Sequence, residues 1–463
     1  MSISVSGPAP APGHAPTPVK AALAAFLGSM VEYYDFFIYG VMATLVLNKV
    51  FFTDTDPATG TLLALATFGV AYVARPIGAF FLGHYGDKIG RKKVMVFCLL
   101  LMGISTFLIG VLPDYNTIGL WAPALLVFLR LCQGLSAAGE QSGASSLTIE
   151  HAPMGRRAFF ASWTLNGTQA GLILANLVFI PFATLPPEHL YSWGWRVPFL
   201  LSAVLVVIAF VVRRTLDDAP VFTDLEEEHQ VEDMPIKALF RDQWRDIIRV
   251  IGCTSIGVVS SVTATFGVAY ASKPEYGHAN VVSSSTMLWV VIGANVGALI
   301  VQPLVAMLSD RIGRKPVLIT AAVGSALSSF FYLSTLTSGN GWLIFLGQFT
   351  ITSLFYSCYN AIWPSFYPEQ FAAKVRYSGV AVSTQLGVVL TGFAPSIAAA
   401  IVLKGETGWL PIAIFVCIAA TLTVVAVLSS RETYNVRLED LGKKNPRRVD
   451  LKNMQAGRVK ETV

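Results

Sequence analysis

The amino-acid sequence predicts an all-α membrane protein that crosses the bilayer many times, and three observations support this prediction. Of the 463 residues, 54% are hydrophobic and only 13% are charged, against about 25% charged in a soluble domain. The mean hydropathy is +0.60. Long apolar segments recur along the chain. Such a chain has too little polar surface to cover a soluble core, which argues against a soluble enzyme, a nucleic-acid-binding protein and a secreted scaffold.

Twelve apolar segments, mostly 19–27 residues long, each fit one tilted helical crossing of a bilayer. They lie at residues 21–47, 61–83, 94–112, 119–149, 159–183, 193–212, 246–272, 283–308, 317–337, 341–366, 377–403 and 408–430. A transmembrane β-barrel would instead show alternating segments of about ten residues. We therefore expect twelve transmembrane helices.

The Lys and Arg residues are divided unevenly between the two predicted sides of the membrane. With a cytoplasmic N-terminus, 27 of the 33 lie on the cytoplasmic side and four on the opposite side, while Arg75 and Arg130 lie inside predicted spans. Cytoplasmic loops carry such an excess of positive charge. We therefore expect both termini in the cytoplasm, and a multi-pass protein of the cytoplasmic membrane of a bacterium.

A charged loop that contains glycine occurs twice. Residues 87–92 read DKIGRK and residues 310–315 read DRIGRK, at an offset of 223. The repeat predicts two six-helix halves of parallel topology, with a substrate site between them. The predicted divisions are a disordered cytoplasmic N-tail 1–20, an N-terminal bundle 21–213, a cytoplasmic central loop 214–245, a C-terminal bundle 246–430 and a basic cytoplasmic C-tail 431–463.

These two loops resemble the signature of the major facilitator superfamily. Further strings resemble its metabolite:proton symporter branch, the relatives of α-ketoglutarate, citrate, shikimate and proline/betaine permeases; they are EYYDFFIYG at 32–40, RPIG at 75–78, RLCQG at 130–134, SWGWRVPF at 192–199 and VRYSG at 375–379. The resemblance implies the major facilitator fold, with twelve helices in two six-helix bundles, and secondary active transport. It also implies a gating role for the loop residues, which are Gly83, Asp87, Gly90, Arg91, Asp310, Gly313, Arg314 and Arg376.

The sequence departs from this branch in two places. Residues 138–143 read AGEQSG, where branch members often carry Gly-Gly-Glu-aromatic-Gly-Gly, so we expect a difference in pocket chemistry. The C-tail shows no sustained heptads, so the coiled coil of some osmosensing betaine relatives is not expected.

Five ionisable residues lie inside predicted spans, all in the N-terminal half: Glu32, Asp35, Arg75, Arg130 and Glu140. Each costs several kcal/mol to place in a bilayer, so such residues mark functional sites. Glu32 and Asp35 share one helix face near the middle of the first span, where neighbouring carboxylates tend to share a proton. We expect this pair to be the proton site, with Arg75 as its partner and Glu140 also involved in coupling. The alternative is two structural ion pairs and one carboxylate in a water-filled cleft.

Polar and aromatic side chains on helix faces predict the substrate site. Arg130 beside Gln133 is suited to anchor a carboxylate, or it could be the fixed structural partner of a first-span acid. The stripe 356–363 interleaves aromatic rings with polar groups, although such stripes are often plain packing. The residues expected to bind substrate are Tyr39, Arg130, Gln133, Gln141, Asn166, Gln169, Tyr356, Tyr359, Asn360 and Trp363.

The sequence therefore predicts a proton-coupled symporter that takes up a small polar metabolite by alternating access. An organic acid is the first candidate substrate and a betaine-type zwitterion the second; a uniporter, an exporter or a non-transporting membrane sensor stays open. No nucleophile–base set or cluster with metal-ligand spacing is found in the sequence, so we expect no enzyme, no metal and no cofactor other than the coupling proton. The expected transport unit is a monomer that contacts its substrate and the lipid bilayer.

Overall fold

The computed structural model describes residues 18–53, 55–89, 91–138, 140–214, 235–372, 375–442 and 446–449. At 44, 83–89, 91–96, 140, 147, 208–214, 235–236 and 238 it describes only the backbone. These ranges are helical apart from turns, loops and one isolated bridge between Val436 and Arg448.

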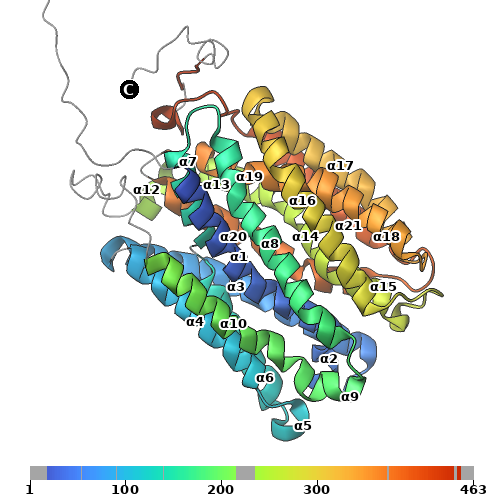
Figure 1. The fold of residues 1–463 in the computed structure, drawn as a ribbon. Coiled ribbons are helices and arrows are strands. Elements are labelled where there is room, and N and C mark those ends of the chain that lie inside the picture. The colour runs from blue at the N-terminus through green and yellow to red at the C-terminus, as the bar shows by residue number, and fades with distance from the viewer. Residues whose placement is uncertain are drawn as a thin grey trace, which may run out of the picture.

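Helices fill both halves of the chain (Figure 1). The first half contains α1 (Pro18–Leu45), α2 (Leu47–Val50), α3 (Pro57–Ile89), α4 (Arg91–Val111), α5 (Tyr115–Ile118), α6 (Trp121–Ser136), α7 (Glu140–His151), α8 (Arg157–Ala183), α9 (Pro187–His189) and α10 (Arg196–Arg214). The second half contains α12 (Pro235–Asp242), α13 (Trp244–Thr254), α14 (Val258–Ser261), α15 (Gly267–Ser272), α16 (Ser284–Ile312), α17 (Arg314–Thr335), α18 (Gly341–Phe349), α19 (Ser357–Gln370), α20 (Arg376–Ile401) and α21 (Leu410–Ser429).

Among the described residues, eleven helical segments are long and apolar enough to cross a membrane. A shorter apolar helix, Phe97–Val111, lies within the predicted third span, where a further crossing was expected. The all-α membrane architecture is thus confirmed. The side of the membrane stays a prediction from the charge distribution, and we call the end of the bundle that carries Arg314 and Glu369 the predicted cytoplasmic end.

Three predicted spans are not continuous α-helices. The fourth is interrupted after Ser136, so that α6 and α7 are separate helices. The seventh and tenth each contain a π-helical turn, at Val262–Phe266 and Thr350–Tyr356. Insertions of this kind are frequent at functional sites, and they shift the helical register of the side chains that follow.

The two halves meet along the centre of the molecule, where α8 packs on α16 and α3 packs on α20 (Figure 1). Glycine makes two close approaches of α3 possible. A Cβ on Gly392 of α20 would clash with the Tyr72 ring, and a Cβ on Gly134 of α6 would clash with the Ala71 carbonyl oxygen. The second approach brings α6 side chains within reach of the α3 backbone.

Ordered structure extends into the predicted tails and the predicted central loop at three places. Helix α1 already begins at Pro18, and α12 lies inside the predicted central loop, of which 215–234 fall outside the described residues. The start of the C-tail, Arg431–Gly442, packs against the bundle, with Arg431 donating a hydrogen bond to the Gln370 carbonyl oxygen at 2.9 Å.

Candidate functional site

Asp35 of α1 is connected to Arg130 of α6 by a chain of hydrogen bonds. Thr106 Oγ1 of α4 donates to Asp35 Oδ2 at 3.1 Å, and Gln133 Nε2 donates to Thr106 Oγ1 at 2.7 Å. Arg130 Nη1 in turn donates to Gln133 Oε1 at 2.6 Å. All four side chains are at most 1% exposed. We call Asp35, Thr106, Gln133 and Arg130 the polar chain; it joins three helices inside an apolar bundle.

Thr106 holds the central place in the polar chain, and the sequence analysis missed it. Its hydroxyl lies 3.1 Å from Asp35 Oδ2 and 2.9 Å from the Met102 carbonyl oxygen. A hydroxyl has one proton, so it donates to one of these acceptors at a time while its lone pairs accept from Gln133. The direction of this hydrogen bond therefore depends on whether Asp35 carries a proton.

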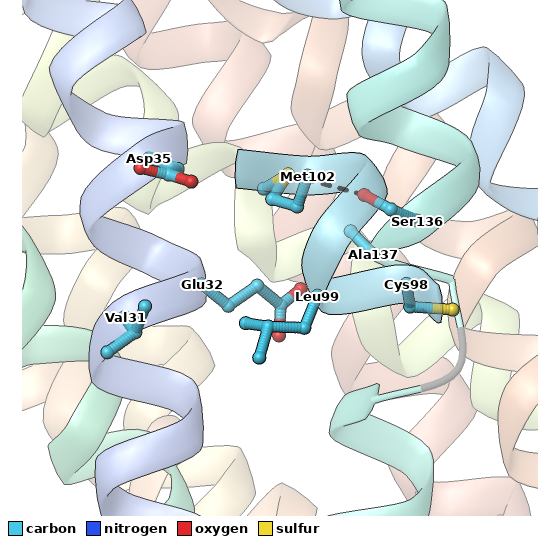
Figure 2. Close-up of a pocket in the computed structure, with 8 residues that line it drawn as sticks. All are labelled: Val31, Glu32, Asp35, Cys98, Leu99, Met102, Ser136 and Ala137. Carbon is cyan, nitrogen blue, oxygen red and sulfur yellow. Dashed lines mark hydrogen bonds between the residues drawn. The ribbon is translucent and has the colours of Figure 1, made fainter. Parts of the chain in front are cut away.

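Glu32 and Asp35 share a small pocket between α1, α4 and α6 (Figure 2). Its walls are Val31, Glu32, Asp35, Cys98, Leu99, Met102, Ser136 and Ala137. The space in it is about that of one water molecule. Asp35 Oδ1 has no hydrogen-bond partner among the described residues, so a water in this pocket would have an acceptor beside it.

Arg130 is occupied by protein groups at all three nitrogens. Besides Gln133, Nε donates to the Thr67 carbonyl oxygen at 3.3 Å and Nη2 to the Phe68 carbonyl oxygen at 3.1 Å. The Tyr39 ring lies 3.8 Å from the guanidinium carbon, and its hydroxyl is 2.5 Å from Thr67 Oγ1. Arg130 and Tyr39 therefore brace each other against α3, and Arg130 reaches the first-span acid Asp35 only through Gln133 and Thr106. The substrate-binding role of Arg130 stays a prediction.

Of the other charges predicted for coupling, Arg75 lies beside the polar chain, because the Phe36 ring centre is also 5.2 Å from the guanidinium carbon of Arg130. The Arg75 guanidinium lies 4.1 Å from the Phe36 ring centre and 4.5 Å from that of Tyr72, and it interacts electrostatically with Glu32. The side chain of Glu140 lies outside the described residues. Gln141 is on α7, beyond the interruption after Ser136.

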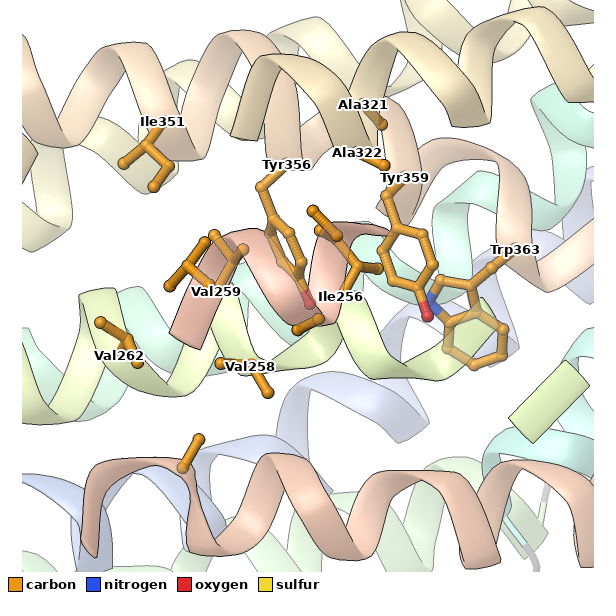
Figure 3. Close-up of a cluster of buried hydrophobic side chains, with 14 of the residues drawn as sticks. Ile256, Val258, Val259, Val262, Ala321, Ala322, Ile351, Tyr356, Tyr359 and Trp363 are labelled. Carbon is orange, nitrogen blue, oxygen red and sulfur yellow. The ribbon is translucent and has the colours of Figure 1, made fainter. Parts of the chain in front are cut away.

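Three aromatic residues of the tenth span, Tyr356, Tyr359 and Trp363, belong to one buried group (Figure 3). The rings of Tyr356 and Tyr359 are 5.6 Å apart, and Trp363 stacks on Tyr367 at 5.3 Å. The Tyr359 and Tyr367 hydroxyls are 2.7 Å apart. Asn360 is buried on the same helix. In this state the group packs on apolar residues such as Ile256 and Val259, labelled in Figure 3.

The two residues of the fifth span that were predicted to bind substrate lie in α8, which packs on α16. Asn166 Nδ2 donates to the Leu299 carbonyl oxygen of α16 at 3.3 Å, and Asn166 Oδ1 is buried without a partner among the described residues. Gln169, one turn along α8, is also buried. Both residues therefore lie in or beside the contact between the halves.

At the predicted cytoplasmic end, Asp310 of α16 connects the halves. Its two carboxylate oxygens accept hydrogen bonds, each 3.1 Å long, from the backbone N–H groups of Ala158 and Phe159. These N–H groups are in the first turn of α8, where the helix dipole stabilises an anion. Arg314 Nη1 donates to Asp310 Oδ1 at 2.7 Å.

Glu369 of α19 is the centre of a buried ion-pair cluster at this end. It accepts two hydrogen bonds from Arg314, at 3.3 and 3.2 Å, and its Oε1 lies 3.2 Å from Nε of Arg157 on α8. Thr433 of the C-tail donates to Glu369 Oε2 at 2.5 Å, and Arg157 donates to the Thr433 carbonyl oxygen at 3.1 Å. We call Arg157, Asp310, Arg314, Glu369 and Thr433 the gate cluster; sequence analysis had identified only Asp310 and Arg314.

The remaining predicted gating residues divide into two groups. Arg376 of α20 pairs with Glu150 of α7 at 3.4 Å, which is a second contact between the halves. Gly313 has φ +107°, which favours glycine, and so makes the turn between α16 and α17. Gly90 lies outside the described residues, and so do the side chains of the first loop, at Gly83, Asp87 and Arg91.

Comparison with known proteins decides the family. Residues 20–246 match the family "Sugar (and other) transporter", and residues 254–454 match "Major Facilitator Superfamily". The chain is 33% identical to a proline/betaine transporter of Salmonella typhimurium, over 90% of this chain and 84% of the relative. It is 35% identical to a shikimate transporter of Escherichia coli, over 89% and 95%. The chain belongs to the major facilitator superfamily.

The fold agrees with this membership. The structure superposes on a partially occluded, inward-open xylose transporter of E. coli with a TM-score of 0.67, over 89% of this chain and 98% of that one, at 18% identity. The predicted family and the major facilitator fold are therefore confirmed. The protein is a multi-pass membrane protein of a transporter superfamily and not an enzyme.

Proposed function

We propose that this major facilitator protein is a proton-coupled symporter that takes up a small metabolite with a carboxylate group. The observation that supports the proposal most is the polar chain, because it places a buried acid beside a pocket with room for one water and connects that acid by hydrogen bonds to a buried cation. An acid in such a position costs several kcal/mol and is found where charge is moved.

Alternating access requires that the halves separate at one end while they stay closed at the other. The gate cluster closes the predicted cytoplasmic end. At the opposite end, Lys273 Nζ donates to Thr61 Oγ1 of the other half at 2.7 Å and lies 3.9 Å from Glu275. Polar contacts thus hold each end of the molecule closed. When an end opens, water can replace these hydrogen bonds, so opening either end is possible, as alternating access requires.

The relatives support a carboxylate as the shared chemistry of the substrate. Proline, betaine and shikimate, the compounds in the relatives' names, all carry a carboxylate. We place an organic acid first. A betaine-type zwitterion is the second candidate, because the clustered rings of Tyr356 and Tyr359 could face a quaternary ammonium group through cation–π interaction.

Purified protein in liposomes that contain a pH-sensitive dye tests the proposal. External shikimate, proline or glycine betaine is added while radiolabelled uptake and internal pH are recorded together. Uptake with internal acidification supports symport. Uptake without a pH change indicates a uniporter, uptake with alkalinisation indicates an exchanger or exporter, and binding without flux indicates a sensor; each of these overturns the proposal.

A further inference from the structure

Arg75 is a buried cation that the polar chain and the gate cluster do not use. It lies in α3, midway through the second span, and is 2% exposed. The rings of Phe36 and Tyr72 pack against its guanidinium at 4.1 and 4.5 Å. These rings hold the guanidinium plane in a fixed orientation but provide no hydrogen-bond acceptor in that plane.

Two of the three nitrogens of Arg75 lack an acceptor. Nε and Nη2 are buried, and neither has a hydrogen-bond partner among the described residues. Arg130 differs, because all three of its nitrogens donate to protein oxygens. Buried donors without partners are costly, so an acceptor from outside the protein would be stabilised at this position.

The two unpartnered groups of Arg75 form the side-on fork of the guanidinium. Their N–H bonds run parallel, at the spacing of the two oxygens of a carboxylate, so one carboxylate accepts from both. Lys offers no such fork, and a neutral alcohol accepts from only one of the two groups. The geometry therefore fits an anion with two neighbouring oxygens, and a carboxylate is the anion that the compounds named for the relatives share.

Arg75 also lies where a ligand could touch both halves. Tyr72, one turn before it on α3, contacts α20 at Gly392. Tyr356 of the second half interacts electrostatically with both Tyr33 of α1 and Tyr72, and Tyr33 and Tyr72 interact with Arg75. The fork thus belongs to an electrostatic network with side chains from both halves, which rigid-body movement of the halves would rearrange.

We infer that Nε and Nη2 of Arg75 bind the carboxylate of the transported metabolite, while Arg130 stays bound to α3 and to the polar chain. The inference rests on the proposed function and replaces Arg130 as the predicted anchor. Glu32 interacts electrostatically with Arg75 from α1, so a substrate carboxylate would share this cation with one of the two pocket acids.

Calorimetric titration of the detergent-solubilised wild type tests the ligand chemistry. The probes are shikimate against its methyl ester, and glycine betaine against choline, so that each pair differs in the carboxylate. We expect one acid or both to bind at least tenfold more tightly than the partner without a carboxylate. Equal binding within both pairs, or no binding of either acid, would overturn the inference.

Arg75→Gln and Arg75→Lys test the residue with the same probes. We expect each variant to weaken binding of the acid at least tenfold. Arg75→Lys should do so although it keeps the positive charge, because lysine lacks the two parallel N–H groups of the fork. Arg245→Gln, at an exposed arginine outside the site, serves as control and binds as the wild type does. Unchanged affinity in Arg75→Lys would overturn the inference. Binding is measured at equilibrium and does not depend on transport. If the Arg75 variants lose acid binding but the wild type moves no protons in liposomes, the inference stands and the proposed function fails.

Discussion

Asp35 and Arg130 are joined through Thr106 and Gln133, and in the part of the chain that the structure describes they form no direct ion pair. A direct ion pair would hold the acid charged and the two helices fixed. Two neutral side chains let the acid gain or lose a proton while the contact between α1, α4 and α6 persists. Thr106 has one proton for two acceptors, so its orientation records the state of Asp35.

The hydroxyl of Thr106 should set the pH range of transport. Thr106→Val keeps the shape of the side chain but removes the donor to Asp35, worth about 1 kcal/mol. The carboxylate is then less stabilised and keeps its proton to higher pH. We expect the pH at which uptake falls by half to move upward, by up to about one unit.

Thr106→Ser is the matched control, because serine keeps the hydroxyl and loses only a methyl group. Its pH profile should stay close to that of the wild type. Uptake measured in liposomes from pH 5 to 9 compares the three proteins. If Thr106→Val lowers the uptake rate equally at every pH and leaves the midpoint unchanged, the role of Thr106 is packing and not control of the proton on Asp35.

Glu369→Gln should open the predicted cytoplasmic end. Removing this charge leaves Arg157 and Arg314 buried with less compensation, a loss of about 3–5 kcal/mol for buried pairs. We expect spin labels at exposed Pro153 and Arg311, on opposite halves, to move apart in pulsed distance measurements, with uptake lost. The control is Glu439→Gln, at an exposed acid of the same C-tail, which should leave the distance between the labels unchanged. If Glu369→Gln also leaves this distance unchanged, the gate cluster does not hold the predicted cytoplasmic end closed.

Lys273 should make thermal stability depend on pH. Burial lowers the pKa of Lys273 to about 8, against the opposing effect of Glu275. Between about pH 8 and 10.5 the unfolded chain binds more protons at this residue than the folded protein does, so stability rises with pH across this window, by on the order of 3 kcal/mol. Below pH 8 both states are protonated and the cost of the buried charge is constant.

Lys273→Met removes this titration. Melting temperatures in detergent at pH 7 and pH 10 should show a larger gain with pH for the wild type than for the variant. Lys404→Met, at an exposed lysine of the same end, should behave as the wild type does. Parallel pH curves for wild type and Lys273→Met would contradict the assignment.

The site residues that could be predicted from the sequence are those whose relation to each other is set by their spacing along a single helix. Glu32 and Asp35 are three residues apart, as are Arg130 and Gln133, and a charge in an apolar span is visible in the sequence. The predicted spans follow hydropathy in the same way. The π-helical turn at Thr350–Tyr356 was not predicted, because apolar composition does not distinguish it from α-helix.

Contacts between distant segments could not be predicted. Thr106 is one hydroxyl in an apolar helix, and such residues more often bond their own backbone, as Thr106 also does. Glu369 and Thr433 are 64 residues apart and have no shared periodicity. Phe36 and Tyr72 are unremarkable aromatic residues until the structure places both on Arg75.

The most direct test of proton coupling is Asp35→Asn, assayed in liposomes for two processes at once. Pre-loaded substrate exchanges for labelled substrate without net proton movement, whereas net uptake driven by an inward proton gradient requires a proton on the acid. We predict that the variant loses gradient-driven uptake and internal acidification, while substrate exchange persists. Gradient-driven uptake with wild-type pH dependence in Asp35→Asn would contradict the account.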